Sequence, residues 1–574
     1  MKTAAGRRQH SDDATRLAAG SRAGPARPRS ADAMGVSSKA LAALLLLLGL
    51  VWFGTLGTRA LIHPDEGRYA SLALEMARSG DWVTPRLNGL PYFEKPALQY
   101  WIGALAFLGF GVSEFSARLW PGLAGFLTVM LVGFTARRLW GRETGIRALA
   151  VAASMTWIEL NSHFLTLDAG LTLFLTLALC AVLLANAGPP QARRRWIWLA
   201  WAAMGGAVLS KGLVGIVIPG AVLVLVSLWR RDAALWRGMH WLSGAMIFLA
   251  ITAPWFVLVS LRNPGFSEFF FIHEHFARYL SDVHNREGAW WYYLPLLLIG
   301  MLPWTSALPW LFRPGGGGSA PIAPRHLLLV WCAFILLFFS ASSSKLPSYI
   351  LPMFPALSLG VAMAMRDASA EALRRHLLLP AVLWGLAALA STQSARFASI
   401  TAPPEVLAPL ASGLRSGAAL VLAGCAFAWW CLGRRRVTAA VLGLAVTHAL
   451  AVVLLLQAHN GYGQLKSAAT LAAALPPSIT PDTPVFAVRD YDQTLPFYLR
   501  RNVVLVDYED EFALGQRREP DKWIPTLDEF VARWQAAPRA AAYMGAATWV
   551  ELHRRGLPMR IVFHDPRRVV VVKP

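Results

Sequence analysis

The chain has 574 residues, of which 56% are hydrophobic and only 15% are charged, and its formal net charge is +21. Soluble domains carry about 25% charged residues, so this composition excludes a disordered chain and an ordinary string of soluble domains. Most arginines stand in short clusters between long apolar runs, a pattern that sets the orientation of membrane spans. We therefore interpret the charge as a topology signal, with attraction to an anionic lipid substrate as the alternative. The sequence predicts a polytopic helical membrane protein.

The first 38 residues are rich in Arg, Ala and Ser and contain no apolar stretch. A signal peptide needs its apolar core close behind a short basic region, and this segment has none. We therefore expect residues 1–38 to form a disordered basic tail in the cytoplasm. The apolar run at 39–58 is then an uncleaved first span.

Fourteen apolar runs approach the length of about 20 residues that a helix needs to cross the hydrocarbon. Thirteen of them cover 39–58, 117–138, 146–162, 168–188, 196–211, 213–230, 239–260, 290–312, 326–342, 346–365, 376–393, 416–433 and 437–457. The remaining run, 97–112, is one of the two shortest and contains Gln99. Whether this run spans the membrane decides on which side every later loop lies.

Arginine clusters decide whether 97–112 spans the membrane. These clusters lie at 137–142, 193–195, 230–231, 374–375 and 434–436. If 97–112 lies flat on the outer interface, all of them face the cytoplasm, and if it spans, all of them move outside. The positive-inside rule therefore predicts about thirteen transmembrane helices, an inner amino terminus and an outer carboxyl terminus.

The composition changes near residue 460. Short β-rich runs at 484–488, 502–507, 560–565 and 567–573 alternate with helix-like stretches such as TLDEFVARWQA. This alternation predicts a small α/β domain over 460–574 in the external compartment, behind a transmembrane domain over 39–459.

Polar residues gather in the loop after the first span, residues 59–116, which this topology places outside. After Pro64 the stretch DEGRYASLALEMARSG has helical spacing, which predicts an amphipathic helix on the outer face. Asp65 stands at the start of this helix, where capping and the helix dipole favour an acid. The alternative is a functional role, because idle carboxylates at the mouth of a bilayer cost desolvation energy.

Other outer loops carry Asp168, Lys211, HEHFARY at 273–279 and SSSKLPSY at 342–349. Each has a structural alternative, because lysines at span ends can reach to the interface and tyrosines can form an aromatic belt. Acids, lysines, histidines and tyrosines from separate loops can instead converge on one outer cavity above a lipid-embedded substrate. We expect the second arrangement.

Several motifs resemble those of the lipid A aminoarabinose transferases, which belong with the protein O-mannosyltransferases among the C-type membrane glycosyltransferases. The resemblance begins in the first outer loop, HPDEGRYASLALEMARSGDWVTPRLNGLPYFEKPALQYW, and continues through SEFSARL, FLTLDAGLTLF, LSKGLVG, FIHEHFARY and SSSKLPSYILPMFPALSL. It covers residues 40–365, and Ala97, where the family often has a second proline after EKP, departs from the pattern. Thirteen spans and a periplasmic carboxyl-terminal domain agree with the family.

The resemblance implies transfer of 4-amino-4-deoxy-L-arabinose from undecaprenyl phosphate to a phosphate of lipid A, a modification that gives polymyxin resistance. The reaction would occur on the periplasmic face of the bacterial inner membrane. The partners it implies are the lipid-linked donor, lipid A and membrane lipid; we expect no nucleic acid and a monomer. The runner-up is transfer of a lipid-linked sugar to protein or another glycan, and a lipid-linked transporter is the alternative of another class.

The resemblance also implies roles for particular residues. Asp65 and Asp168 match the catalytic acids, and Glu94 and Lys95 match residues that hold a metal or the carrier phosphate. Spacing favours a histidine paired with the distant carboxylate of Glu94, so our candidate ligands for a divalent metal (zinc, magnesium or manganese) are Glu94 and His275. The candidate substrate-binding residues are Arg68, Tyr69, Tyr92, Lys95, Lys211, Arg278, Lys345 and Tyr349.

These residue types suit the chemistry of sugar transfer from a phosphate. Breaking the bond develops negative charge on the carrier phosphate, which fixed cations such as Lys95, Lys345 and Arg68 would stabilise. For an alcohol acceptor Asp65 would be a general base. A lipid A phosphate is already ionised, so Asp65 would then orient the acceptor, hold a cation between two phosphates or shield the anomeric carbon.

Overall fold

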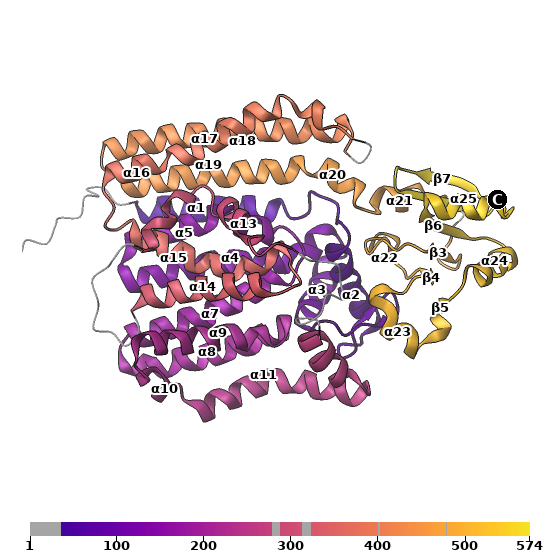
Figure 1. Ribbon diagram of the computed structural model, residues 1–574, viewed down its shortest axis with the longest axis horizontal. Coiled ribbons are helices and arrows are strands. Elements are labelled where there is room, and N and C mark those ends of the chain that lie inside the picture. The colour runs from indigo at the N-terminus through magenta and orange to yellow at the C-terminus, as the bar shows by residue number, and fades with distance from the viewer. Residues whose placement is uncertain (1–35, 278–287, 313–322, 400–401, 478) are drawn as a thin grey trace, which may run out of the picture.

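The structure is a computed structural model that describes residues 36–277, 288–312, 323–399, 402–477 and 479–574. Long helices run side by side in one elongated bundle, and a smaller domain of strands and helices caps one end of it (Figure 1). Almost all of the predicted tail lies outside the described residues. The fold class predicted from the sequence is confirmed at this level.

Helices occupy each of the thirteen predicted runs. In the bundle they are α1 (Ser38–Gly54), α4 (Glu114–Trp140), α5 (Arg142–Ser154), α6 (Thr156–Ser162), α7 (Asp168–Ala187), α8 (Pro190–Lys211), α9 (Val214–Arg230), α10 (Ala234–Arg237), α11 (Trp241–Arg262), α13 (Tyr293–Gly300), α14 (Pro324–Ala341), α15 (Phe354–Ala364), α16 (Ala370–His376), α17 (Leu378–Ser391), α18 (Pro404–Gly433) and α19 (Val437–Ala458). Shorter 3-10 segments are η2 (Thr305–Phe312), η3 (Pro347–Met353) and η4 (Ser394–Phe397), and η1 (Glu268–Ala277) is a π-helix.

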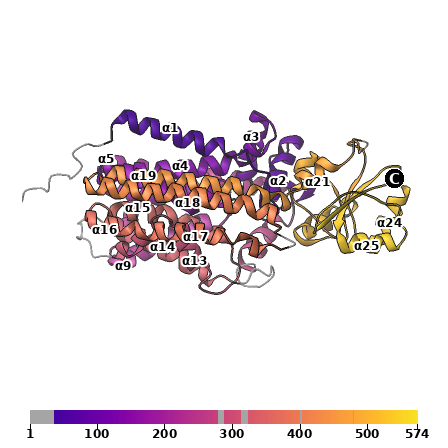
Figure 2. The same cartoon turned by 90° about the horizontal axis from the view of Figure 1, so that it is seen from above.

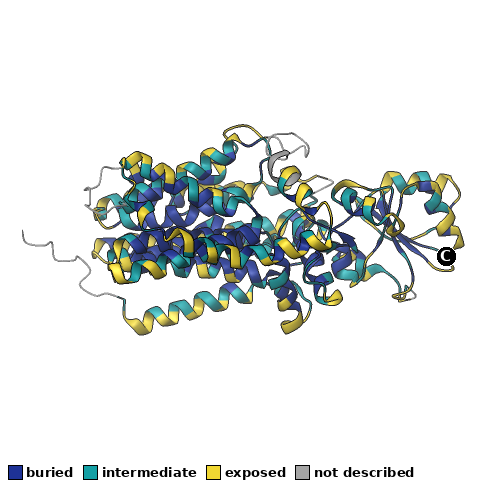
Figure 3. Ribbon diagram, turned by 90° about the horizontal axis from the view of Figure 1, so that it is seen from below, coloured by how far each residue is buried: buried dark blue, intermediate teal, exposed yellow. Residues whose placement is uncertain are grey.

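Within the described ranges, eight helical segments are long and apolar enough to cross a membrane, or nine when the bent pair α13 and η2 counts as one. Helices α1 and α9 are apolar but shorter. The number of thirteen spans therefore stays a prediction. Buried residues fill the centre of the bundle, whereas α1 stands apart and exposes much of its surface (Figures 2 and 3). That exposure suits a helix whose leucines face lipid.

The first outer loop folds into α2 (Asp65–Ser79), the short strands β1 (Arg86–Leu87) and β2 (Leu90–Pro91), and α3 (Leu98–Phe110). Helix α3 has 13 residues, so it is about 20 Å long and too short for a hydrocarbon core of about 30 Å. It buries Tyr100 and Phe107 and exposes Leu108 and Phe110. A helix that lies on the outer interface has this two-sided character, which supports the interfacial interpretation of 97–112.

We expect reporter fusions after Arg195 and after Gly461 to report opposite compartments, the first cytoplasmic and the second periplasmic. The reason is that arginine-rich loops stay inside while an odd number of spans carries the chain across. A paired alkaline phosphatase and fluorescent-protein assay measures both ends. The same compartment for both fusions would contradict the count.

The carboxyl-terminal domain has one mixed six-stranded sheet with the order β5-β4-β3-β6-β8-β7. Its strands are β3 (Val485–Val488), β4 (Val504–Val506), β5 (Trp523–Ile524), β6 (Ala541–Gly545), β7 (Arg560–His564) and β8 (Arg568–Val572). The helical segments are α20 (Asn460–Leu465), α21 (Ala469–Ala474), α22 (Leu495–Leu499), η5 (Asp510–Phe512), α23 (Ala513–Arg518), η6 (Pro520–Lys522), α24 (Leu527–Ala536) and α25 (Ala546–Arg554). Strands β3 to β6 run parallel, β8 pairs antiparallel with β6, and β7 pairs antiparallel with β8.

The two faces of this sheet have different partners because alternate residues of a strand point to opposite sides. Phe486 and Val488 pack in a core with Phe530 and Trp534 of α24. Val485 and Ala487 belong instead to the buried cluster that contains α2 and α3 of the membrane domain. The carboxyl-terminal domain is therefore packed directly onto the first outer loop.

Candidate active site

The predicted helix after Pro64 is confirmed as α2, and Asp65 is its first residue. Among the described residues, the hydrogen bond that its carboxylate accepts comes from the Arg68 side chain and not from a backbone N–H. It forms an ion pair of 2.7 Å with Arg68 Nη1, and 37% of the Asp65 side chain remains exposed. Capping therefore does not explain this acid, although the helix dipole still favours it. Asp65 keeps a face that a substrate can reach.

Arg68 is held by the carboxyl-terminal domain. Its Nε donates to Glu511 Oε2, and Glu511 Oε1 accepts from Gln493 Nε2 at 2.9 Å. Burial opposes the charge on Arg68, but Glu511, with Tyr92, Asp65 and Tyr69 adding to its effect, holds the arginine pKa well above its usual value. Burial raises the pKa of Glu511 despite its pairing with Arg68. Asp65, Arg68 and Glu511 thus form one chain of charges across two domains.

Tyr69 and Tyr92 lie beside these charges and are buried. Tyr69 stacks on Tyr100 of α3 with ring centroids 6.4 Å apart. Burial raises the pKa of both predicted tyrosines well above 10, with acids such as Asp65 and Glu94 adding to the effect. Both phenols are therefore neutral and can donate hydrogen bonds. Their burial in the protein argues against the aromatic-belt alternative for Tyr92.

A second group joins Asp168, Lys211 and Tyr349. Asp168 begins α7 and Lys211 ends α8, and these two helices pack antiparallel, so the residues meet at the same end of the pair. Lys211 Nζ lies 2.5 Å from Asp168 Oδ1 and 4.4 Å above the ring centre of Tyr349 on η3. Lys211 thus forms an ion pair and a cation–π contact within the protein. A lysine that only reached to the interface would make neither.

The two groups are connected through buried neighbours. Glu66, which follows Asp65, accepts from the backbone N–H of Leu165 at 2.9 Å, three residues before Asp168. Leu167 and Leu209 belong to the same buried cluster as Tyr69 and Tyr92. Residues predicted from four separate segments are therefore assembled at one end of the membrane domain.

Glu66 has a structural role that the sequence analysis did not assign. It pairs with Arg118 of α4 through two bonds, from Nε at 2.6 Å and from Nη2 at 2.8 Å, and neither side chain is more than 2% exposed. Arg118 also donates to the carbonyls of Leu56 and Arg59. This pair fixes α2 to the first span. The sequence signal for this ion pair was Arg118 itself, the arginine of SEFSARL, because it stands alone at the start of an apolar run.

Lys95 and Lys345 receive local partners. Lys95 Nζ donates to the Glu94 carbonyl at 2.7 Å. Lys345 Nζ donates to the carbonyls of Ser340 and Ser342 at 2.9 and 2.6 Å, at the end of α14. The neighbouring hydroxyls of Ser343 and Ser344 are buried without a partner among the described residues. Such hydroxyls, next to the ammonium group of Lys345, suit a phosphate.

The predicted metal pair is only partly described. Glu94 lies between Tyr92 and Lys95 on the first outer loop, but the His275 side chain and all of Arg278 lie outside the described residues. Across the part of the chain that the structure describes, no three His, Cys, Asp or Glu side chains gather into a metal site.

Comparison with known proteins identifies the family of this architecture. Residues 34–270 match the model of the dolichyl-phosphate-mannose-protein mannosyltransferases, and residues 471–573 match the aminoarabinose transferase C-terminal domain. The ArnT of Cupriavidus metallidurans, in a crystal structure bound to undecaprenyl phosphate, superposes with a TM-score of 0.89 at 36% identity. That match covers 94% of this chain and 99% of the ArnT chain, and the apo crystal structure gives a TM-score of 0.87.

Curated relatives agree with the structural match. An undecaprenyl phosphate-alpha-4-amino-4-deoxy-L-arabinose arabinosyl transferase of Pseudomonas aeruginosa is 37% identical over 362 residues, which are 61% of this chain and 65% of the relative. A similarly named protein of Pseudomonas fluorescens is 34% identical over 57% of this chain. The matched segments span only 56 to 65% of the length of these relatives. With the many apolar helices, they make this a multi-pass protein of the bacterial inner membrane. The chain belongs to the ArnT family of aminoarabinose transferases.

Proposed function

We propose that this protein is a glycosyltransferase that moves 4-amino-4-deoxy-L-arabinose from undecaprenyl phosphate to a phosphate of lipid A. The observation that supports the proposal is that two charged groups lie at one end of the membrane domain and are connected through Glu66 and a shared buried cluster. One group is Asp65, Arg68 and Glu511, and the other is Asp168, Lys211 and Tyr349. This end also carries the carboxyl-terminal domain (Figure 1). By the distribution of arginines, it faces the periplasm.

The donor would place its phosphate among fixed cations. Lys95, Lys345 and the hydroxyls of Ser343 and Ser344 are candidates, because charge-assisted bonds to a phosphate oxygen are strong in a site with little water. As the sugar–phosphate bond breaks, negative charge grows on the carrier phosphate and positive charge on the anomeric carbon. The cations would stabilise the first, and the carboxylates of Asp65 and Asp168 the second.

Asp65 need not remove a proton when the acceptor is a phosphate, since an ionised phosphate is already a nucleophile. Its ion pair with Arg68 leaves part of its carboxylate exposed, which suits a group that faces the anomeric carbon. Arg68 in turn carries a secure positive charge, which suits a group that draws the acceptor phosphate toward the sugar. The 4-amino group of the sugar would meet an environment rich in carboxylates and neutral tyrosines.

Mass spectrometry of lipid A from cells with and without the gene tests the proposal. We expect the lipid A of cells with the gene to be heavier by one aminopentose, and deletion of the gene to remove that species. Persistence of the species after deletion would contradict the proposed function. A lipid-linked sugar found on protein instead would favour the O-mannosyltransferase-like alternative.

We expect Lys211→Met to lower transfer by about 10- to 100-fold, because it leaves the buried Asp168 carboxylate without its cation. Initial rates with purified protein, donor and lipid A measure the change. Lys39→Met is the matched control, since Lys39 is exposed at the start of α1 and should have no effect. Equal rates for Lys211→Met and Lys39→Met would remove the Asp168–Lys211 pair from the site.

A further inference from the structure

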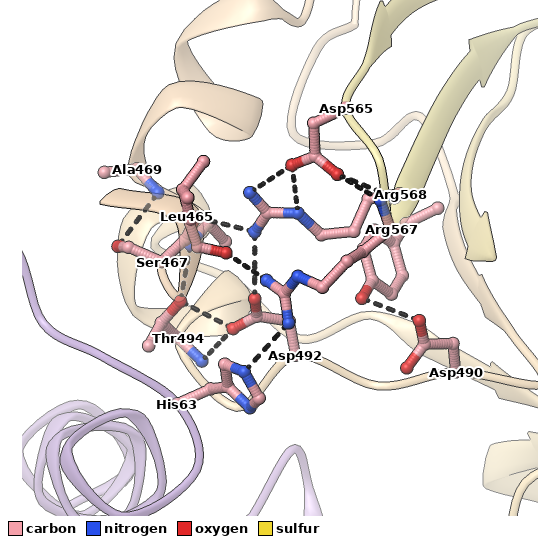
Figure 4. Close-up of polar contacts among 12 residues, drawn as sticks. His63, Leu465, Ser467, Ala469, Asp490, Asp492, Thr494, Asp565, Arg567 and Arg568 are labelled. Carbon is pink, nitrogen blue, oxygen red and sulfur yellow. Dashed lines mark hydrogen bonds and ion pairs between the residues drawn. The ribbon is translucent and has the colours of Figure 1, made fainter. Parts of the chain in front are cut away.

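A buried polar network in the carboxyl-terminal domain reaches His63, which lies two residues before the start of α2 (Figure 4). Arg568 is its centre and is 2% exposed. Its guanidinium binds Asp565 at 2.6 Å and Asp492 at 3.2 Å, and it donates to the Ser467 carbonyl at 2.6 Å. A buried network in which charges are paired and hydrogen-bonded is rigid.

This network fixes the turn at residues 492–494. Asp492 Oδ1 accepts from the Thr494 N–H at 2.9 Å and from the Thr494 hydroxyl at 2.6 Å. Thr494 Oγ1 accepts in turn from the Ala468 N–H at 2.8 Å. The turn is therefore tied to both Arg568 and the segment that leaves the last bundle helix.

The turn then packs on α2 at Gly67, the residue between Glu66 and Arg68. A Cβ at Gly67 would lie 2.4 Å from the Gln493 carbonyl carbon and from the Thr494 nitrogen. Only glycine permits so close an approach of two backbones. The Ser71 hydroxyl donates to the Gln493 carbonyl at 3.1 Å, and the Gln493 side chain donates to Glu511, the partner of Arg68.

A second contact joins the carboxyl-terminal domain to His63, which lies two residues before the start of α2. Arg567 Nη1 lies 3.2 Å from His63 Nε2, and its Nη2 donates to the Leu465 carbonyl. Because arginine can only donate, His63 Nε2 is the acceptor and carries no proton. Burial lowers the pKa of His63, with Arg567, Lys466 and Arg568 adding to the effect and Asp492 opposing it, which favours this neutral form.

We propose that these five residues, Asp492, Gln493, Thr494, Arg567 and Arg568, form a seat that positions Asp65 and Arg68 for transfer. The effects on kcat that we expect rest on the proposed function, because they presuppose that the protein catalyses sugar transfer. The apolar face of the sheet already attaches the domain to the loop, through the buried cluster that includes Val485 and Tyr543. The polar seat adds what apolar packing lacks, a fixed orientation of the first turn of α2. Its members are positioning residues, since they act through Asp65 and Arg68.

Gly67→Ala is the sharpest test in the full-length protein. Alanine has a higher helix propensity than glycine, so the substitution would stabilise α2 if propensity were its only effect. If the added Cβ instead pushes α2 away from the seat, kcat should fall. We expect kcat to fall by about 10- to 100-fold and KM for the lipid-linked donor to change less than about threefold. Gly109→Ala is the matched control, because Gly109 lies in α3 with open space around it. Unchanged kcat for Gly67→Ala would overturn the proposal.

A double-mutant cycle tests the second contact even if Gly67→Ala does not fold. We expect His63→Ala and Arg567→Ala each to lower kcat, the double variant to lose no more than the worse single one, and His63→Gln to recover part of the loss. Multiplicative losses would overturn the coupling. Arg501→Ala is the control, because the bonds that Arg501 makes among the described residues go to the carbonyls of Thr480, Pro481 and Thr483 in its own domain.

Hydrogen–deuterium exchange tests the structural role of the seat independently of the proposed function. We expect Gly67→Ala and Arg567→Ala to raise exchange in residues 65–72, and the two control variants to leave it unchanged. If the wild-type protein transfers no aminoarabinose, the proposed function fails while this exchange pattern still tests the seat. Unchanged exchange in α2 would overturn the seat whatever the wild-type protein transfers.

Discussion

Replacing Asp65 by Asn is expected to lower transfer by about 100- to 1000-fold while the protein still folds, the size of effect that removal of a transition-state contact produces. The amide keeps the shape of the side chain but loses the charge that would face the anomeric carbon. Folding should change little, because the Asp65 carboxylate is bonded to the Arg68 side chain and this ion pair is partly exposed. Initial rates and elution profiles in detergent measure both quantities.

Asp81→Asn is the matched control for this variant. Asp81 lies on the same outer loop, its side chain is 32% exposed, and it pairs with Arg262 while also accepting from the N–H groups of Val83 and Thr84. Asn at this position likewise removes one partly exposed carboxylate that pairs with an arginine. We expect it to transfer at nearly the wild-type rate. Normal transfer by Asp65→Asn would remove Asp65 from the catalytic residues, and an aggregated elution profile would make it a structural residue.

Replacing Arg118 by Met should lower the free energy of unfolding by about 3–5 kcal/mol, because it leaves the Glu66 carboxylate buried and unpaired. Two bonds to Glu66 and those to the carbonyls of Leu56 and Arg59 disappear together. The arginine now holds the pKa of Glu66 below its usual value against the effect of burial. Thermal unfolding in detergent measures the loss.

A second substitution separates charge from packing. Glu66→Leu in the Arg118→Met background removes the unpaired carboxylate, and we expect it to restore much of the lost stability. Arg138→Met, an exposed arginine near the end of the same helix, should change stability by no more than about 0.5 kcal/mol. Equal unfolding temperatures for Arg118→Met and Arg138→Met would show that the Glu66–Arg118 pair does not support the fold.

Local pattern predicted the elements with strong local signals. Helix α2 could be read from its apolar spacing after Pro64, and α24 from TLDEFVARWQA. Strands β3, β4, β7 and β8 coincide with β-rich runs. Strand β6 was missed because AAYMG lacks β-branched residues, and β5 because it has only two residues. The helices of the run 146–162 break at Met155, for which composition gives no signal.

The residues of the candidate site likewise fall into those with a local sequence signal and those without one. Asp65, Arg68, Asp168, Lys211 and Tyr349 stand in motifs, so resemblance identified them, and the structure brings them together in two groups. Glu511 pairs with Arg68 across 443 residues of sequence, and Gln493 adds a second bond. Nothing local marks either residue, since one more acid or amide in an α/β domain has no pattern. Contacts between domains become visible only in three dimensions.

Reconstitution of the purified protein with undecaprenyl phosphate-linked aminoarabinose and lipid A tests the central claim most directly. Mass spectrometry of the lipid A should show a gain of one aminopentose with the wild-type protein and the Asp81→Asn variant, and almost none with Asp65→Asn. Lipid A that stays unmodified with the wild-type protein, or that gains the sugar equally with Asp65→Asn, would contradict the account.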